Sequence, residues 1–387
     1  MKPYLLAPRF AANRLWLAAR EVPSWHIAPA RTGNVRDLVT GADLVTFTNS
    51  SPAWGFDSSG VLVQPSANVP FVEYDPSTGA ALGWRHWEAV TNLGLHSRDL
   101  TQTAWVKSGI TPTRDQIGAD GTANTANRLT ATASDGTALQ TITSASATRV
   151  SGFLIKRITG TGVIQITQDG GATWNTVTIT NQWLRYSIAA ATVTNPQIGF
   201  RIRSSGDEIA VDFAQLQSSS ILGPPVVTTS LSASSTADVA SITGSAFTGI
   251  WNQAAWTVYS DSMIAVSQIK TQGVWEAAGG TYASSLRQPQ GTANQFRAVV
   301  GGTFSASPGT GGLLTAGTTR AAVAATGGAG RLQVGDAGAD ITSANAPDPT
   351  VLWIGNLNGA TQLNGYIREM ATLKSRRPNT NLQAMML

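Results

Sequence analysis

Short segments in which apolar and polar residues alternate dominate the chain from about residue 93 onward. Such alternation places successive side chains on opposite faces of a β-strand. In EIAVDFAQL (208–216), Ile209, Val211 and Phe213 are expected to share one face. The segments with this pattern are 162–168, 176–180, 197–203 and 208–216. They predict a β-sandwich, a jelly roll or a similar fold, over residues 93–222.

A linker separates this region from a second series of strands. Residues 223–240 begin with Gly-Pro-Pro and continue in a Ser/Thr-rich run, which is typical of a domain boundary. The strands expected beyond it are 254–266, 295–302, 319–325, 350–356 and 365–373. Gly-rich turns separate them, and they predict a second sandwich over 241–387. The expected fold class is therefore all-β, with two tandem jelly-roll β-sandwiches.

The N-terminal part of the chain follows a different pattern. Residues 9–20, RFAANRLWLAAR, combine good helix formers with amphipathic spacing, and Pro23 ends this predicted helix. Such a helix is expected to dock on a partner or a neighbouring subunit. Residues 37–92 alternate short apolar runs with turn dipeptides and predict an irregular β-rich attachment segment. The expected divisions are a basic arm (1–36), this segment (37–92), a first sandwich (93–222), a linker (223–240) and a second sandwich (241–387).

Charge is concentrated at the N-terminus. Only 12% of residues are charged, against about 25% in an ordinary soluble domain. Residues 1–36 carry six basic side chains and one acid, whereas the rest of the chain holds 20 basic and 21 acidic residues. Nucleic-acid binding needs a basic stripe on the folded surface, and the body of the chain offers none. The arm alone could touch nucleic acid or an acidic protein surface, and we expect no nucleic-acid partner.

Several classes of site are excluded by what the chain lacks. It has no cysteine, which excludes disulfides, thiolate metal sites and thiol catalysis. No apolar run approaches the ~18 residues of a membrane span, and Pro8 and Arg9 end the first apolar run too early for a signal peptide. His26, His86 and His96 do not have the spacing of metal ligands. We expect neither a metal ion nor another cofactor.

Motifs for catalysis are missing as well. The sequence has no Gly-x-Ser-x-Gly elbow and no phosphate-binding loop. Its 22 acids are scattered singly, and they offer no facing pair of the kind that cleaves glycosidic bonds. Asp336 and Asp340 lie in a Gly-rich loop, where a turn is favoured over a calcium site. We expect the protein not to be an enzyme.

TQDGGATW (167–174) has the Ser/Thr-x-Asp-x-Gly-x-Thr-Trp pattern of an Asp-box. Asp169 is expected to accept hydrogen bonds from amides of its own turn, as Asp side chains readily do. Gly171 would allow the tight turn, and Trp174 would pack beneath it. A single copy of this pattern indicates a structural β-hairpin turn.

The chain contains 12 tryptophans, and such rings either fill cores or stack on the apolar faces of sugar rings. Trp275 and Tyr282 lie in the Gly-rich segment QGVWEAAGGTY and are the candidates for an exposed carbohydrate-binding platform. The tryptophans in apolar strand segments, which are expected in the cores, are Trp105, Trp183, Trp256 and Trp353.

Residues 37–93 contain three blocks of residues in a specific order and spacing. The blocks consist of Phe47, Thr48, Ser50, Ala53, Asp57 and Gly60, then Ala67, Asn68, Pro70, Asp75, Pro76, Thr78, Gly79, Leu82 and Gly83, then Glu88, Thr91, Asn92 and Leu93. They resemble the N-terminal portion of bacteriophage head-spike and tail-fibre proteins, whose blocks read F-T-R-x-S-x-A-x-x-x-D-x-x-G, A-x-N-x-P-R-F-x-x-D-P-x-T-G-x-x-L-G and E-x-x-x-T-N-L. Asn49 replaces the usual Arg, and Phe71 follows Pro70 without the intervening Arg. Ser50, Ala67 and Glu88 each lie one position away from the spacing of these patterns.

Further segments extend this resemblance. SRDLTQTAWVK (97–107) matches S-x-D-x-x-x-x-x-W-x-K, which opens a carbohydrate-binding-module-like jelly roll in that family. DFAQLQ (212–217) resembles the closing strand of such modules. Residues 363–385 resemble the end of laminin-G or concanavalin-like lectin jelly rolls, where a strand leads into a short helix.

The resemblance implies a virion fibre or spike on a phage or phage-like particle, assembled in the host cytoplasm. Its sandwiches would bind host surface polysaccharide or another envelope receptor during host attachment, without catalysis. The arm would attach it to capsid, portal-proximal or baseplate proteins. A homotrimer is expected, with a pentamer as the alternative. The expected virion-attachment residues are Arg9, Arg14, Trp16 and Arg20.

Two other functions stay open. One is a structural capsid or tail decoration protein that has no host ligand. The other is a polysaccharide depolymerase, which would release sugar and would need a facing pair of acids.

Overall fold

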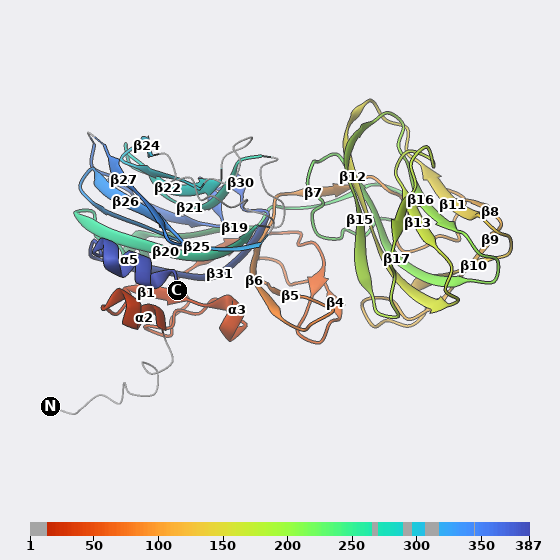
Figure 1. The fold of residues 1–387 in the computed structure, drawn as a ribbon, viewed down its shortest axis with the longest axis horizontal. Coiled ribbons are helices and arrows are strands. Elements are labelled where there is room, and N and C mark those ends of the chain that lie inside the picture. Colours follow the sequence, from red (N-terminus) through yellow and green to blue (C-terminus); the bar gives the residue numbers. More distant parts are fainter. Residues whose placement is uncertain (1–13, 265–269, 289–295, 306–316, 344) are drawn as a thin grey trace.

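The molecule consists of two β-sandwiches that lie side by side along its long axis (Figure 1). The sandwich formed by residues 93–222 is called the inserted sandwich. The other is called the composite sandwich, because its strands come from both sides of the inserted one in the sequence. The predicted all-β fold is confirmed, since strands form both bodies and the helices are short. This computed structural model describes residues 14–264, 270–288, 296–305, 317–343 and 345–387.

The inserted sandwich consists of two five-stranded antiparallel sheets. The first sheet has the order β15 (Leu184–Val193), β12 (Ala147–Thr159), β17 (Glu208–Gln217), β10 (Ala126–Ala131) and β9 (Ile110–Gln116). The second has the order β14 (Asn175–Val177), β13 (Ile164–Thr167), β16 (Gln197–Ile202), β11 (Gly136–Thr141) and β8 (Val106–Ser108). Alternating apolar side chains, including Trp105, Phe153 and Phe200, fill the space between the sheets. The strands predicted in this region correspond to β13, β14, β16 and β17.

The composite sandwich packs an eight-stranded sheet on a seven-stranded one, as far as the described residues show. The larger sheet has the order β27 (Ala337–Thr342), β26 (Ala329–Val334), β25 (Gly317–Thr326), β20 (Ala255–Ile264), β31 (Gly365–Leu373), β6 (Ala81–His86) and β5 (Val72–Tyr74), with β1 (Trp25–Ile27) also paired to β31. The smaller has the order β2 (Thr46–Thr48), β19 (Val239–Thr243), β28 (Val351–Ile354), β21 (Gln272–Ala278), β22 (Ser284–Gln288), β23 (Arg297–Val300) and β24 (Thr303–Ser305). Its core is rich in tryptophan and includes Trp25, Trp84, Trp256 and Trp275.

Strands from the first 92 residues complete this composite sandwich. β1 pairs with β31, with Trp25 opposite Thr372, and β6 pairs with the other end of β31. In the facing sheet, β2 pairs with β19. The expected divisions after residues 36 and 92 therefore do not match this fold. Strands of three to six residues bury too little apolar surface to fold alone, and their apolar side chains enter the core of the larger body.

The chain enters and leaves the inserted sandwich along one two-stranded ribbon. β7 (Val90–Asn92) pairs with β18 (Ala233–Ser235), which lies within the expected linker 223–240. The buried side chain of Asn92 donates hydrogen bonds to the carbonyls of Ala214 and Val226 and accepts the amide of Leu216. This one side chain ties the entering segment, β17 and the leaving segment together.

A small apolar cluster joins the two sandwiches. Phe56 and Leu62, from β3 (Gly55–Phe56) and β4 (Leu62–Val63), pack against Leu154 and Phe213 of the first sheet of the inserted sandwich. Trp54 meets the ring of Phe213 edge-on at a centroid distance of 5.2 Å. Part of the outer face of the first sheet is thus covered, and the second sheet lies on the far side of the inserted sandwich.

Phe213 reaches this cluster because β17 contains a bulge. Phe213 has a φ of 47°, and the register of β17 against β12 shifts at this point. Ile209 and Val211 face the sandwich core before the bulge, and Ala214 and Leu216 face it afterwards. The prediction that Phe213 shares a face with Ile209 and Val211 is wrong, because the extra residue reverses the alternation.

Short helices lie on the outside of the composite sandwich. α2 (Arg14–Ala19) packs beside α5 (Asn379–Met385), which follows β31 (Figure 1). The helix predicted over 9–20 is therefore present in its described part, but it docks on its own chain. None of the helices in the described ranges has the length and apolar character needed to cross a membrane. The remaining elements are α3 (Pro29–Thr32), α4 (Gly244–Ile250), β29 (Asn356–Leu357) and β30 (Thr361–Gln362).

Candidate functional site

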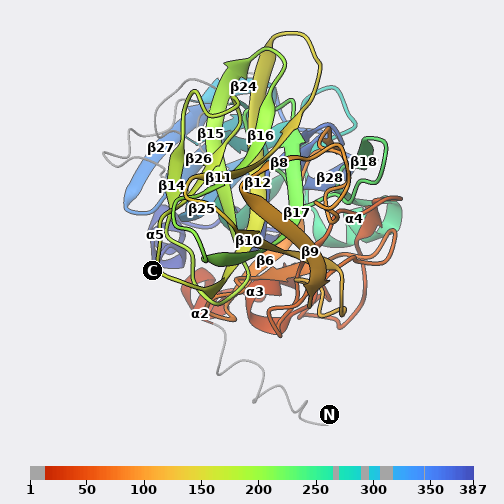
Figure 2. The ribbon, with the colours of Figure 1, turned by 90° about the vertical axis from the view of Figure 1, so that its right-hand side faces the viewer.

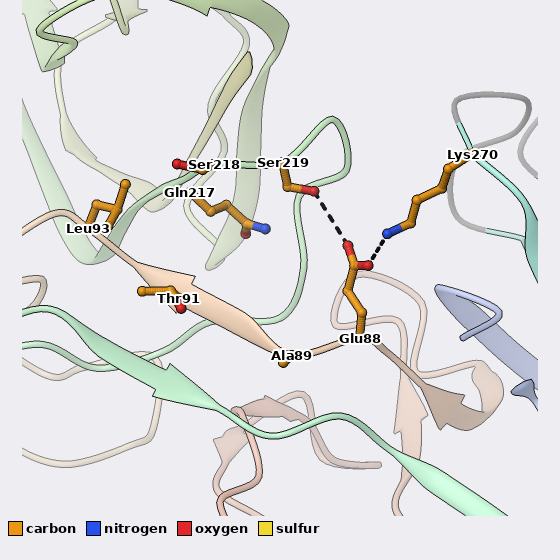
Figure 3. Close-up of a pocket in the computed structure, with 8 residues that line it drawn as sticks. All are labelled: Glu88, Ala89, Thr91, Leu93, Gln217, Ser218, Ser219 and Lys270. Carbon is orange, nitrogen blue, oxygen red and sulfur yellow. Dashed lines mark hydrogen bonds and ion pairs between the residues drawn. The ribbon is translucent and has the colours of Figure 1, made fainter. Parts of the chain in front are cut away.

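A cavity lies where the two sandwiches meet (Figure 3). Its volume is about 470 Å³, and small-ligand sites range from about 300 to 1,000 Å³ and occur preferentially at such junctions. Its walls come from the β6–β7 connection, β7, the end of β17 and the residues before β21. The lining residues are Glu88, Ala89, Thr91, Leu93, Gln217, Ser218, Ser219 and Lys270.

Glu88 and Lys270 form the charged centre of this junction cavity. The Glu88 carboxylate pairs with the Lys270 ammonium and accepts a 3.4 Å hydrogen bond from Ser219 Oγ (Figure 3). Only 26% of the Glu88 side chain and 32% of the Lys270 side chain are exposed. Burial lowers the pKa of Lys270. The pair is held in place by the fold, since the Glu88 amide also donates to Asn364 Oδ1 at 3.2 Å.

The rest of the wall divides into groups already bonded and groups that a ligand can reach. Gln217 Oε1 accepts the Gly223 amide and its Nε2 donates to the Ile221 carbonyl, both at 3.0 Å. Thr91 Oγ1 shares a 2.7 Å hydrogen bond with Ser234 Oγ. A hydroxyl both donates and accepts, so a serine or threonine can keep one partner and bind a second. The cavity therefore offers hydroxyls, one carboxylate and one ammonium.

This lining suits the binding of a polar ligand rather than its cleavage. Glu88 is the one carboxylate among the described lining residues, and it is paired with a cation. Cleavage of a glycosidic bond normally uses two facing carboxyl groups. Leu93 and Ala89 supply the small apolar part of the wall.

Trp275 does not lie in an exposed loop. It belongs to β21, is 0% exposed and meets Trp256 edge-on at a centroid distance of 6.1 Å. Its expected place on a carbohydrate-binding platform is therefore wrong, because strand alternation directs its ring into the core. Tyr282 lies in the turn after β21 and is 36% exposed, with its amide bonded to Asp348 Oδ1 at 2.7 Å. The two rings do not form a common platform.

The segment 167–174 forms a tight turn between β13 and β14. Asp169 Oδ1 accepts the Thr173 amide at 2.9 Å and the Thr167 hydroxyl at 2.8 Å. Gly171 has a φ of 90°, and a Cβ there would lie 2.7 Å from the Trp174 ring. The turn thus sets Trp174 against its own backbone at the edge of the second sheet.

The four tryptophans predicted in the cores divide equally. Trp105 and Trp256 are buried, which confirms their predicted place. Trp183 is half-buried, with the Lys156 ammonium 4.8 Å from the centroid of its ring. Trp353 is also half-buried, because its side of β28 faces away from the composite core.

The expected attachment residues occupy different settings. Arg9 lies outside the described residues. Arg14 belongs to α2, and Arg20 is exposed just beyond it, with a φ of 52°. Trp16 is 7% exposed and donates a 2.8 Å hydrogen bond to Nδ1 of His26. This corrects its expected role, because its ring is packed within its own chain.

The acids of the C-terminal Gly-rich loop do not converge. Asp340 lies on β27 and pairs with Arg331 of β26 at 3.0 Å, and Asp336 lies in the turn between these strands. Within the described ranges, no group of three or more acidic or histidine side chains is placed to hold a metal ion.

Most residues of the 37–93 motif stabilise the fold, and a few reach the cavity. Asp75 Oδ1 accepts the amides of Ser77 and Thr78, so the D-P-x-T-G block forms the turn between β5 and β6. Glu88, Thr91 and Leu93, from the E-x-x-x-T-N-L block, line the junction cavity. The sequence did not identify these three residues as a site, because their block indicated only a resemblance to a family. Lys270 and the serines after β17 carried no signal beyond loop composition.

No family model matches this chain, and no curated protein sequence matches it. Among solved structures, the CBM40 of Ruminococcus gnavus IT-sialidase, bound to α2,3-sialyllactose, is similar at 11% identity and a TM-score of 0.29, over 35% of this chain and 83% of that one. The sialidase of Trypanosoma rangeli in complex with DANA is similar at 14% identity and a TM-score of 0.30, over 38% of this chain and 26% of that one. This chain thus spans about a quarter of the sialidase. Similarity at this level does not assign the chain to either family.

Proposed function

We propose that this protein is a virion fibre or spike that binds host surface saccharide without catalysis, and that the junction cavity is one of its binding sites. The observation that carries the proposal is the lining of the cavity, where Glu88, Lys270 and Ser219 converge with further hydroxyls. Saccharide hydroxyls donate and accept hydrogen bonds at once, as these groups require. The virion role is supported by the resemblance of residues 37–93 to phage head-spike and tail-fibre proteins.

A particle would compensate for weak binding at each site. A polar cavity of this size gives few contacts to one sugar unit, and several copies on a virion surface raise the overall avidity. A homotrimer or pentamer, attached to other virion proteins through the basic N-terminal arm, would supply those copies. The alternative, a decoration protein without a host ligand, leaves the cavity without a role.

The first experiment measures binding of the full-length chain to whole host cells and to their extracted polysaccharide, together with release of reducing sugar. The full chain is required, because a fragment that begins at residue 93 lacks β1, β2, β5 and β6 of the composite sandwich. Binding without sugar release supports the proposal. Release of sugar would make the protein a depolymerase, and absence of binding would favour a decoration protein.

Variants then test the cavity itself. Glu88→Gln removes the charge and keeps the shape, and it should weaken polysaccharide binding about tenfold, because a hydrogen bond to a charged group contributes about 1.5–3 kcal/mol. Asp43→Asn, at a side chain that is 71% exposed, is the matched control and should bind like the unmodified chain. Equal loss in both variants would argue against the cavity as a site.

A further inference from the structure

A row of polar side chains crosses the outer face of the second sheet of the inserted sandwich. Strand pairing places Thr176, Gln165, Arg201, Thr137 and Ser108 side by side on β14, β13, β16, β11 and β8. Their neighbours along β13, β16 and β11 belong to the sandwich core, so the members of the row point outward. Four steps of about 4.8 Å between strands give a row about 19 Å long. Figure 2 views the molecule from the end occupied by this sandwich.

Arg201 is the centre of this polar row. Its Nε and Nη2 donate to Gln165 Oε1 at 2.8 and 2.6 Å, and its guanidinium lies 4.4 Å from the centroid of the Trp174 ring. The side chain is 21% exposed, and Nη1 has no hydrogen-bond acceptor among the described residues. The turn around Asp169 therefore does more than join two strands, because it places an indole beside a cation on an outer face.

The charge around the polar row is positive. Asp135 Oδ1 lies 3.0 Å from Arg203 Nε and 4.0 Å from Arg201 Nε. Two guanidinium groups thus share one carboxylate, and the three side chains keep one net positive charge. On the first sheet, Phe56 and Leu62 cover the part of the outer face around Leu154 and Phe213.

We propose that the polar row binds a carboxylate-bearing polysaccharide that lies across the strands. Arg201 pairs with a sugar carboxylate through a charge-assisted hydrogen bond, which is about twice as strong as a neutral one. Trp174 provides apolar contact to the sugar ring, and Thr137 and Gln165 bind hydroxyls. The proposal rests on the proposed function, and it adds an acidic class of ligand and an extended site separate from the junction cavity.

The test compares binding of the full-length chain to polygalacturonate and to neutral dextran, at low and high salt. We expect at least tenfold tighter binding to polygalacturonate, reduced by salt because ions screen exposed charges. Arg201→Gln and Thr176→Glu should each weaken it at least tenfold. Arg114→Gln, on β9 of the opposite sheet and 41% exposed, is the matched control and should bind normally. Thr176 is exposed, so Thr176→Glu decides the question even if Arg201→Gln fails to fold.

The outcomes separate this inference from the proposed function. Equal binding to both polymers, no binding to polygalacturonate at low salt, or unchanged binding by Thr176→Glu would overturn the inference. If host-cell binding is then lost in Glu88→Gln and kept in Arg201→Gln, the junction cavity alone accounts for attachment. If the unmodified chain binds neither cells nor their polysaccharide, the proposed function itself fails.

Discussion

Trp251, Trp256 and Trp275 form a continuous series of ring contacts in the core of the composite sandwich. The centroid distances are 4.9 Å from Trp251 to Trp256 and 6.1 Å from Trp256 to Trp275. Each ring removes a large apolar area from water and adds an orientation-dependent contact to its neighbour. These residues therefore contribute to stability, and the exposed Tyr282 does not share that role.

Trp275→Ala should lower the free energy of unfolding by about 3–5 kcal/mol, because it leaves a large cavity in a packed core. Tyr282→Ala should change it by no more than about 0.5 kcal/mol, as surface substitutions usually do. Urea denaturation of both variants measures the difference. If the Trp275→Ala protein had normal stability and had lost saccharide binding, the buried position of Trp275 would be contradicted.

The lowered pKa of His86 makes the free energy of unfolding depend on pH. Burial, together with the neighbouring Arg85 charge, lowers the pKa of His86 to about 3 from 6.5. Between these values the unfolded chain takes up a proton that the folded chain does not, so the free energy of unfolding falls as the pH drops from about 6.5 to about 3. The slope from this one group is about 1.4 kcal/mol per pH unit. Denaturant titrations from pH 7 to 4 should show it, and His86→Met should remove it.

At the scale of elements, some strands were predicted from their local pattern, whereas others, among them the long strands β12 and β15, were not. Residues 365–373 coincide with β31, because nine residues are long enough for a strand to be identified, and most of them are buried. β1 and β2 have three residues each, and their partners β31 and β19 lie far along the chain, so neither length nor local pattern identified them. The junction cavity could not be predicted from the sequence either, since three segments that lie far apart in the chain form it. The bulge at Phe213 had no local signal either.

A substitution at Gly83 tests the pairing of β6 with β31. It has a φ of 133°, and a Cβ there would lie 2.7 Å from the backbone oxygen of Ile367. Gly83→Ala should separate these strands, with a lower Tm and faster amide exchange in β6. Gly249→Ala, in α4 with no atom within 4 Å of the added methyl group, should be neutral or stabilising by about 0.5–1 kcal/mol. Similar exchange rates in both variants would contradict the close approach.

For the whole molecule, the division into two sandwiches was predictable and the membership of the composite one was not. The alternating segments lie in two groups, and each group forms one body. The chain enters and leaves the inserted sandwich at one place, where β7 pairs with β18. The strands before residue 93 can therefore join the strands that follow the inserted sandwich. The boundaries expected after residues 36 and 92 were therefore wrong, because strand pairing, and not order in the sequence, defines which segments form the composite sandwich.

A fragment of residues 93–387 should not fold cooperatively, because it lacks four strands of the composite sandwich and the core residues Trp25 and Trp84. A chain of residues 14–387 should fold like the full-length protein, since it retains every described strand. Size-exclusion chromatography and thermal unfolding compare the two. A monomeric fragment 93–387 with a normal unfolding transition would show that the N-terminal strands are dispensable.

The pairing of β1 with β31 also determines when the composite sandwich can form during translation. Trp25 pairs with Thr372, and a ribosome that adds about 5–20 residues per second needs roughly 17 to 70 s to pass from one to the other. The inserted sandwich can fold in that interval, while the N-terminal strands still lack their partner. A nascent chain interrupted before β31 therefore keeps open strand edges, which invite pairing with other chains. Completion of translation becomes the step that separates usable subunits from aggregation-prone fragments.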